Sequence, residues 1–191
     1  MRGLMVTVGG VLLLSTTAPG VAPYDLVGTT RAHERPEPNA VVWIEATTAS
    51  GRETRKAVLD QQNLTFSPHV LAVRTGTTVE FPNRDRVFHN VFSFHDGKRF
   101  DLGMYPVGTV RNVTFGEPGV SRIFCNIHPN MAAYVMAVDS EYFAVSDSSG
   151  RFLITAVPPG THVYHAWRPG GTTLTGSTVV DGDKPLEIRW P

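Results

Sequence analysis

The chain has 191 residues, enough for one large domain or two small ones, and it holds 17 Lys+Arg against 17 Asp+Glu. This even balance gives no support to nucleic acid or an anionic membrane surface as a partner, and we expect neither. The 18 Gly and 14 Pro residues favour a turn-rich β protein over a helical one.

The N-terminus has the pattern of a secretory signal peptide. Arg2 supplies a positive charge, Leu4–Leu14 is an apolar run, and mostly small residues follow up to Ala22. The apolar run is well short of the roughly 20 residues that cross a bilayer, so we expect no transmembrane span. We therefore predict a Sec-type signal peptide at residues 1–22 and a periplasmic or otherwise exported protein. A buried first strand is the alternative interpretation of this run.

After the signal peptide the chain reads as all-β, with short alternating segments separated by Gly, Pro, Asn and Asp. Residues 96–108 are irregular and are expected to hold at most a short helical turn. Many short strands without helical periodicity indicate a β-sandwich or barrel. The predicted strands are Ala40–Ile44, Val70–Val73, Val79–Phe81, Phe88–Phe94, Thr109–Phe115, Val120–Cys125, Ala133–Val138, Phe143–Val145, Arg151–Ile154 and His162–Trp167.

The only cysteine of the chain stands in a segment with two other soft metal donors. Cys125 is followed by His128 and Met131, and His89 lies upstream on a predicted strand. With 7 His and 5 Met in the chain, this spacing after a given Cys arises by chance roughly once in a thousand. Two His, one Cys and a weak axial Met form the ligand set of a blue-copper electron-transfer site.

The predicted strands clamp this loop from two sides. Cys125 ends one strand, His128 and Met131 lie on the loop after it, and His89 comes from a neighbouring strand. Groups around the ligands matter nearly as much as the ligands. Asn90 is expected to tie the His89 segment to the cysteine loop, and Pro129 to stiffen that loop and remove one N–H.

Other candidate donors receive a structural interpretation. Met136 is an alternative axial ligand, but its place on an apolar strand favours a core role. The remaining histidines have no second ligand at a useful spacing, and no nucleophile elbow, phosphate loop or carboxylate pair is evident. These histidines are His33, His69, His95, His162 and His165.

Residues 79–83, 88–91 and 124–131 resemble the cupredoxins, and the short loop after Cys125 is similar to that of amicyanins. The resemblance covers roughly 63–139. It implies a Greek-key β-sandwich with one type 1 copper ion held by His89, Cys125, His128 and Met131. Residues 126–127 depart from the Thr/Ser-Pro pair that the family often has, which puts the reduction potential in question more than the binding.

The resemblance implies an exported, monomeric carrier of single electrons between a redox donor and an acceptor, and not an enzyme. In such proteins the exposed ligand, here His128, is where electrons enter and leave. A periplasmic copper delivery or storage protein is the alternative, but it would be richer in Met and His. A sandwich that has lost its metal is a third possibility, against which the intact ligand set argues.

The C-terminal part resembles carboxypeptidase-regulatory or transthyretin-like β-sandwich modules, in the turns at 147–152 and 157–161. Residues 140–191 alone are few for an independent core. Residues 24–47 resemble the opening strands of that family and bring the total to 76. We therefore predict a discontinuous domain, 24–47 plus 140–191, with a cupredoxin domain of 58–139 inserted.

This hypothesis has a geometric requirement and a rival. Gln61–Leu64 and Val138–Ser140 would both have to lie away from the metal loop, so that the insert can leave and rejoin its host. The rival hypothesis is that Ala40–Ile44 pairs with Val70–Val73 inside the cupredoxin sheet.

Overall fold

A computed structural model describes residues 22–45, 55–94 and 97–191 of the protein. These residues are all-β, with 18 strands and no helix. It follows that no described helix could serve as a membrane span. The predicted signal peptide lies outside the described residues apart from Ala22, and so does His95.

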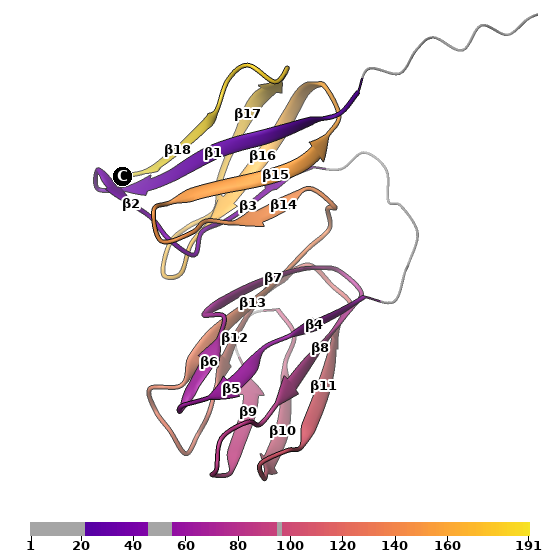
Figure 1. Ribbon diagram of the computed structural model, residues 1–191, viewed down its shortest axis with the longest axis vertical. Helices are drawn as coiled ribbons and strands as arrows, with labels where there is room; N and C mark the ends of the chain where they lie inside the picture. Colours follow the sequence, from indigo (N-terminus) through magenta and orange to yellow (C-terminus); the bar gives the residue numbers. More distant parts are fainter. Residues whose placement is uncertain (1–21, 46–54, 95–96) are drawn as a thin grey trace, which may run out of the picture.

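The strands form two β-sandwiches that lie one above the other along the long axis of the molecule (Figure 1). The lower one, which we call the first sandwich, has a five-stranded sheet of order β10-β9-β12-β13-β7 and a three-stranded sheet of order β11-β8-β4. The chain passes repeatedly between the two sheets, in a Greek-key manner. A separate hairpin, β5–β6, belongs to this sandwich. The bounds are β4 Lys56–Val58, β5 Asp60–Gln62, β6 Thr65–Ser67, β7 Val70–Arg74, β8 Thr77–Pro82, β9 His89–Ser93, β10 Phe100–Tyr105, β11 Val110–Phe115, β12 Gly119–Phe124 and β13 Ala132–Val138.

Alternating side chains of the two sheets fill the core of the first sandwich. Val79 and Phe81 of β8 pack with Val91 of β9 and Ile123 of β12, and all four are fully buried. Cys125 and Met131 belong to this same cluster. The metal loop is therefore anchored in the core and is not an appendage of it.

The second sandwich combines the two ends of the described chain. One sheet has the order β15-β1-β18, with β2 paired to β1, and the other has the order β14-β3-β16-β17. Gly28 of β1 leaves room for the Phe152 ring, since a Cβ there would lie 2.2 Å from Phe152 Cζ. The bounds are β1 Tyr24–Ala32, β2 Arg35–Pro36, β3 Val41–Ile44, β14 Phe143–Val145, β15 Arg151–Val157, β16 Gly160–Trp167, β17 Leu174–Val180 and β18 Leu186–Trp190.

Strand pairing bears on where the two sandwiches divide. β3 pairs with β14 and β16, whereas β7 pairs with β13. The first sandwich begins with β4, which pairs with β8, so it starts earlier than the predicted boundary at 58. The expectation for Gln61–Leu64 is wrong: Asn63 and Leu64 contact Asp85, four residues before His89, because the chain enters the sandwich through β4 instead. The division into two domains stays a prediction.

A third apolar cluster joins the two sandwiches. It contains Met136 and Val138 of β13, Val70 of β7, and Val41 and Trp167 of the second sandwich, all buried. β13 is thus buried on both faces, with alternate residues in the core of the first sandwich and in this shared cluster. We call this cluster the shared interface.

The prediction for residues 96–108 is wrong, because this segment contains β10. The strand pairs with β9 but its register shifts between Asp101 and Met104, and Gly103 has a φ of 63°. This irregularity breaks the alternation that would have indicated a strand.

Candidate metal centre

Three side chains from two separate segments of the chain meet at one end of the first sandwich. His89 is the first residue of β9, Cys125 directly follows β12, and His128 lies on the loop that leads to β13. Their donor atoms all lie within 4.8 Å of one another, and this is the only group of three or more His, Cys, Asp or Glu in the described ranges that is close enough to hold a metal ion. The strand order β9-β12-β13 brings them together.

The three donors form a triangle. Cys125 Sγ lies 3.9 Å from His89 Nδ1 and 3.7 Å from His128 Nδ1, and the two Nδ1 atoms are 3.2 Å apart. Zinc, for comparison, forms bonds of about 2.0 Å to nitrogen and 2.3 Å to sulfur. With such bonds, three donors arranged trigonally around one ion would lie about 3.5–3.8 Å from one another. The triangle therefore has the size that a central, three-coordinate metal ion requires.

Met131 closes the loop that carries Cys125 and His128 through backbone hydrogen bonds. Its N–H donates to His128 O at 2.9 Å, and its carbonyl accepts from Cys125 N–H at 3.3 Å. The side chain is fully buried in the cluster that contains Cys125. Met136, the alternative axial ligand, lies instead in the shared interface, so the structure brings Met131 and not Met136 to the core around Cys125.

The two histidines differ in how far they are buried. His89 is fully buried, whereas His128 is half-buried. The neighbouring side chains of Phe88, Met104 and Ile127 are exposed by 52%, 60% and 42%. Phe88 precedes His89, Met104 lies opposite Asn90 on β10, and Ile127 precedes His128, so exposed apolar side chains occur on the segments that carry both histidines. Among the three donors, His128 is the one that reaches the surface.

The buried histidine has a charged partner that sequence reasoning missed. His89 Nε2–H donates to Asp85 Oδ2 at 2.8 Å, and the Asp85 side chain is only 11% exposed. Burial raises the pKa of Asp85, but hydrogen bonds from Leu64 N–H, His89 and Asn63 N–H outweigh it and lower that pKa overall. The spacing of four residues before His89 was the only available signal, and it is a weak one.

The two predicted supporting residues lie as follows. Asn90 is buried, and its amide donates to Asp101 of β10 at 2.8 Å. It thus ties β9 to β10, whereas we had expected it to tie β9 to the cysteine loop. Pro129 is exposed on the loop between His128 and Met131. Phe88 and Phe94, which flank β9, are more than half exposed.

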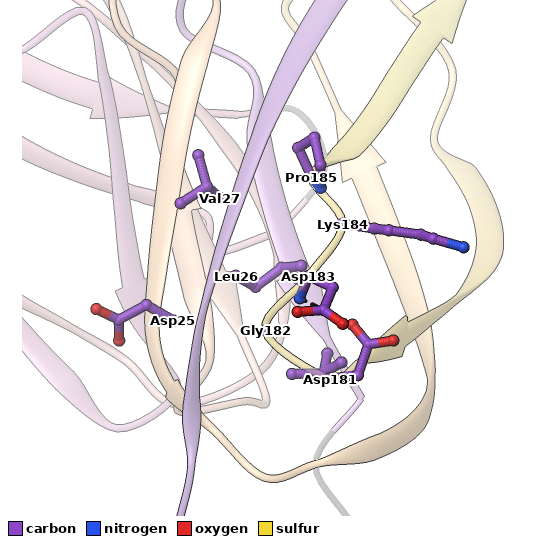
Figure 2. A pocket seen from close by; sticks show the side chains of 9 residues that line it. Asp25, Leu26, Val27, Asp181, Gly182, Asp183, Lys184 and Pro185 are labelled. Atoms are coloured by element: carbon purple, nitrogen blue, oxygen red, sulfur yellow. Dashed lines mark hydrogen bonds between the residues drawn. The ribbon is translucent and has the colours of Figure 1, made fainter.

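The remaining described histidines lie elsewhere. His165 contacts Thr175 and Glu45 on the second sandwich, and His162 contacts the Pro158 carbonyl. A separate hollow lies between β1 and the β17–β18 turn (Figure 2). Two of its three acidic residues already bond backbone groups, since Asp25 accepts from Ala156 N–H and Asp181 from Asp183 N–H.

Comparison with known proteins found likenesses among solved structures only. No family model and no curated protein matches the chain. A purple cupredoxin from Nitrosopumilus maritimus is 28% identical over 44% of this chain and 99% of its own, with a TM-score of 0.39. Amicyanin from Paracoccus versutus is 22% identical over 48% of this chain and 96% of its own, with a TM-score of 0.40.

A copper-containing nitrite reductase from Thermus scotoductus SA-01 is 24% identical over 57% of this chain, with a TM-score of 0.43, and the match spans 28% of the reductase. All three TM-scores lie below 0.5. We therefore judge the chemistry of the metal centre from its own residues.

Proposed function

We propose that the protein is an exported type 1 copper protein that carries single electrons between redox partners, with copper held by His89, Cys125 and His128 and more weakly by Met131. The observation that carries this proposal is the triangle of one thiol and two imidazole Nδ1 atoms, with distances of 3.2–3.9 Å. A His₂Cys trigonal site beside a Met is the donor set typical of blue-copper electron-transfer centres.

The surrounding residues suit electron transfer more than catalysis. When bound, copper would supply a one-electron Cu(II)/Cu(I) couple. His89, Cys125 and Met131 are buried, so three of the four proposed ligands are shielded from water and from a substrate. His128 alone is half-buried, and it offers a short route to a partner docked on the neighbouring exposed side chains.

Copper delivery or storage is the second candidate function. A thiol and two imidazoles also bind Cu(I), so the donor set alone does not separate the two functions. After the predicted signal peptide the chain holds only three methionines, Met104, Met131 and Met136. Met136 lies in the shared interface, and Met104 is exposed by 60% on β10 opposite Asn90, so they do not form a methionine-rich cluster. A carrier keeps its copper through both oxidation states, whereas a delivery protein releases Cu(I) to an acceptor.

The test is the visible spectrum of the purified full-length protein after addition of one equivalent of Cu(II). We expect an intense thiolate-to-copper band, reversible loss of the band on reduction, and one copper per chain. Cys125→Ser should abolish the band, because a hydroxyl cannot replace the thiolate donor. His165→Ala is the matched control on the second sandwich and should leave the band intact. A copper-loaded, oxidised wild type without a strong visible band would contradict the carrier and favour Cu(I) delivery.

Export and domain organisation belong to the same proposal. The predicted signal peptide at 1–22 would deliver the chain to the periplasm or beyond, where unidentified redox proteins act as donor and acceptor. The pairing of β1 and β3 with strands after Ser140 supports a discontinuous, transthyretin-like module around the inserted copper domain.

A further inference from the structure

The turn between β5 and β6 is unusual in its residues. Asn63 and Leu64 have φ values of 56° and 57°, which is the left-handed conformation that a two-residue type I′ turn demands. Glycine is the common choice at the second position, and a leucine there is strained. The Leu64 side chain is 49% exposed, so burial of that side chain does not offset the strain.

The amide groups of this turn meet the carboxylate of Asp85. Asn63 N–H donates to Asp85 Oδ1 at 2.6 Å, and Leu64 N–H donates to Oδ2 at 2.9 Å. Successive amides of a turn can form a small concave site for an anion, and here the anion is a side chain of the same protein. The Asp85 N–H in turn donates to Asn83 Oδ1 at 3.0 Å, which fixes the backbone of the segment.

Hydrogen bonds of Asp85 connect this turn to His89 of the metal centre. Oδ2 accepts from Leu64 N–H and from His89 Nε2–H. A carboxylate accepts and does not donate, so it holds the His89 proton on Nε2. The free lone pair of a neutral imidazole is then on Nδ1, the atom that lies 3.9 Å from Cys125 Sγ and 3.2 Å from His128 Nδ1.

We propose that Asp85, anchored by the amides of Asn63 and Leu64, is a positioning residue that fixes the tautomer and orientation of His89 and favours the oxidised state of the bound metal. Partners that bond the outer nitrogen of a ligand histidine raise its basicity, and their loss typically costs about 10–100-fold in metal affinity. A negative charge beside the ligand also stabilises the more positive metal ion. The identity of the metal, and only that, rests on the proposed function.

The first experiment needs no metal. In the metal-free, full-length protein, long-range ¹H–¹⁵N NMR reports which nitrogen of His89 carries the proton. We expect the Nε2–H form in wild type and a mixture of tautomers in Asp85→Ala. A wild-type His89 protonated on Nδ1, or an Asp85→Ala spectrum identical to wild type, would overturn the positioning role even if the protein binds copper.

The second experiment uses the copper-loaded protein. Asp85→Asn keeps an oxygen acceptor but removes the charge, so we expect a higher reduction potential and a visible band that remains. Asp85→Ala removes both, and we expect Cu(II) affinity, measured by chelator competition, to fall by about 10–100-fold. Asp60→Asn is the matched control. This carboxylate lies on the β5–β6 hairpin, whose turn anchors Asp85, but it bonds Gln61 N–H and Arg84 instead of a histidine.

Leu64→Gly retains both turn amides and should leave the potential unchanged. Equal potentials in wild type and Asp85→Asn would overturn the proposal, and so would equal shifts in Asp85→Asn and Asp60→Asn. A wild type with no thiolate band refutes the proposed function instead, and in that case the NMR experiment still decides the role of Asp85.

Discussion

The two sandwiches differ in what they bury. In the first sandwich, polar side chains are buried around the metal end, among them Gln61, Asn83, His89 and Asn90. In the second, the buried polar side chains are hydroxyls that bond backbone groups, as Thr30 does with the carbonyls of Glu37 and Gly150. Burying amide and imidazole groups is unfavourable unless they find partners, and here Asn83, His89 and Asn90 each have one. Among the described residues of the second sandwich, no amide or imidazole side chain is buried in this way.

The shared interface qualifies this contrast. β13 follows the metal loop and gives one face to the core of the first sandwich and the other to the second sandwich. Two polar contacts lie near the C-terminal end of β13. Arg74 forms an ion pair with Glu141, and the Thr75 hydroxyl donates to Asp139. The second sandwich thus covers the outer face of β13, the strand that directly follows the metal loop.

The largest expected effect comes from removing the second sandwich. A fragment of residues 55–139 would expose Val70, Met136 and Val138, which are buried in the whole protein. At about 1.5–3 kcal/mol for each side chain, the loss approaches the total stability of a small domain. We expect the fragment to aggregate or unfold, measured by thermal unfolding and size-exclusion chromatography. A soluble, blue fragment with the thermal midpoint of the whole protein would show that the first sandwich folds independently.

A single substitution tests the same interface in the full chain. Trp167 is buried there and packs edge-on against Tyr134 of β13, with ring centroids 5.4 Å apart. We expect Trp167→Ala to lower the free energy of unfolding by about 3 kcal/mol in denaturant titrations. Val179→Ala is the control, because Val179 is 54% exposed on β17 and should cost less than about 0.5 kcal/mol. If the two variants were equally stable, the shared interface would not stabilise the protein.

Met131, directly before β13, and Met136, on β13, separate metal chemistry from packing. Met131→Leu should leave copper bound but shift the reduction potential, since it removes a weak axial donor. Met136→Leu should leave the potential and the visible spectrum unchanged, because this side chain lies in the shared interface. Both swaps nearly conserve volume and should cost less than about 1.5 kcal/mol in stability. A shift in the potential for Met136→Leu alone would reverse the assignment of the axial ligand.

How well the sequence predicts each feature depends on how far apart along the chain the residues that form it lie. The loop from Cys125 to Met131 is local, and strand alternation was clear enough to foresee β3, β9, β12 and β13 within about a residue. β10 was missed because Gly103 and the register shift break its alternation. Asp85 was missed because its role depends on the amides of a turn more than 20 residues earlier. Such hydrogen bonds leave no periodic signal, and they appear only when the chain is folded.

The smallest expected effect concerns pH and the hydrogen bonds of the metal end. Tyr105 of β10 is fully buried, donates to Phe81 O at 3.1 Å and accepts from Gln61 Nε2 at 2.6 Å. Burial raises its pKa to about 12, although the Gln61 bond opposes the shift. Since the folded state favours the neutral phenol, this stabilisation is complete below the unfolded pKa of 10 and is lost as the pH rises through about 12.

Urea titrations at pH 8, 10 and 11.5 should therefore show a loss of stability that is smaller in Tyr105→Phe than in wild type. At pH 8 the same variant should cost about 1 kcal/mol, because Gln61 keeps its bond to Pro82 O at 3.0 Å. If both proteins lost stability equally between pH 10 and 11.5, groups other than Tyr105 would govern alkaline unfolding. The difference in buried polar groups between the two sandwiches would then have no effect on how stability depends on pH.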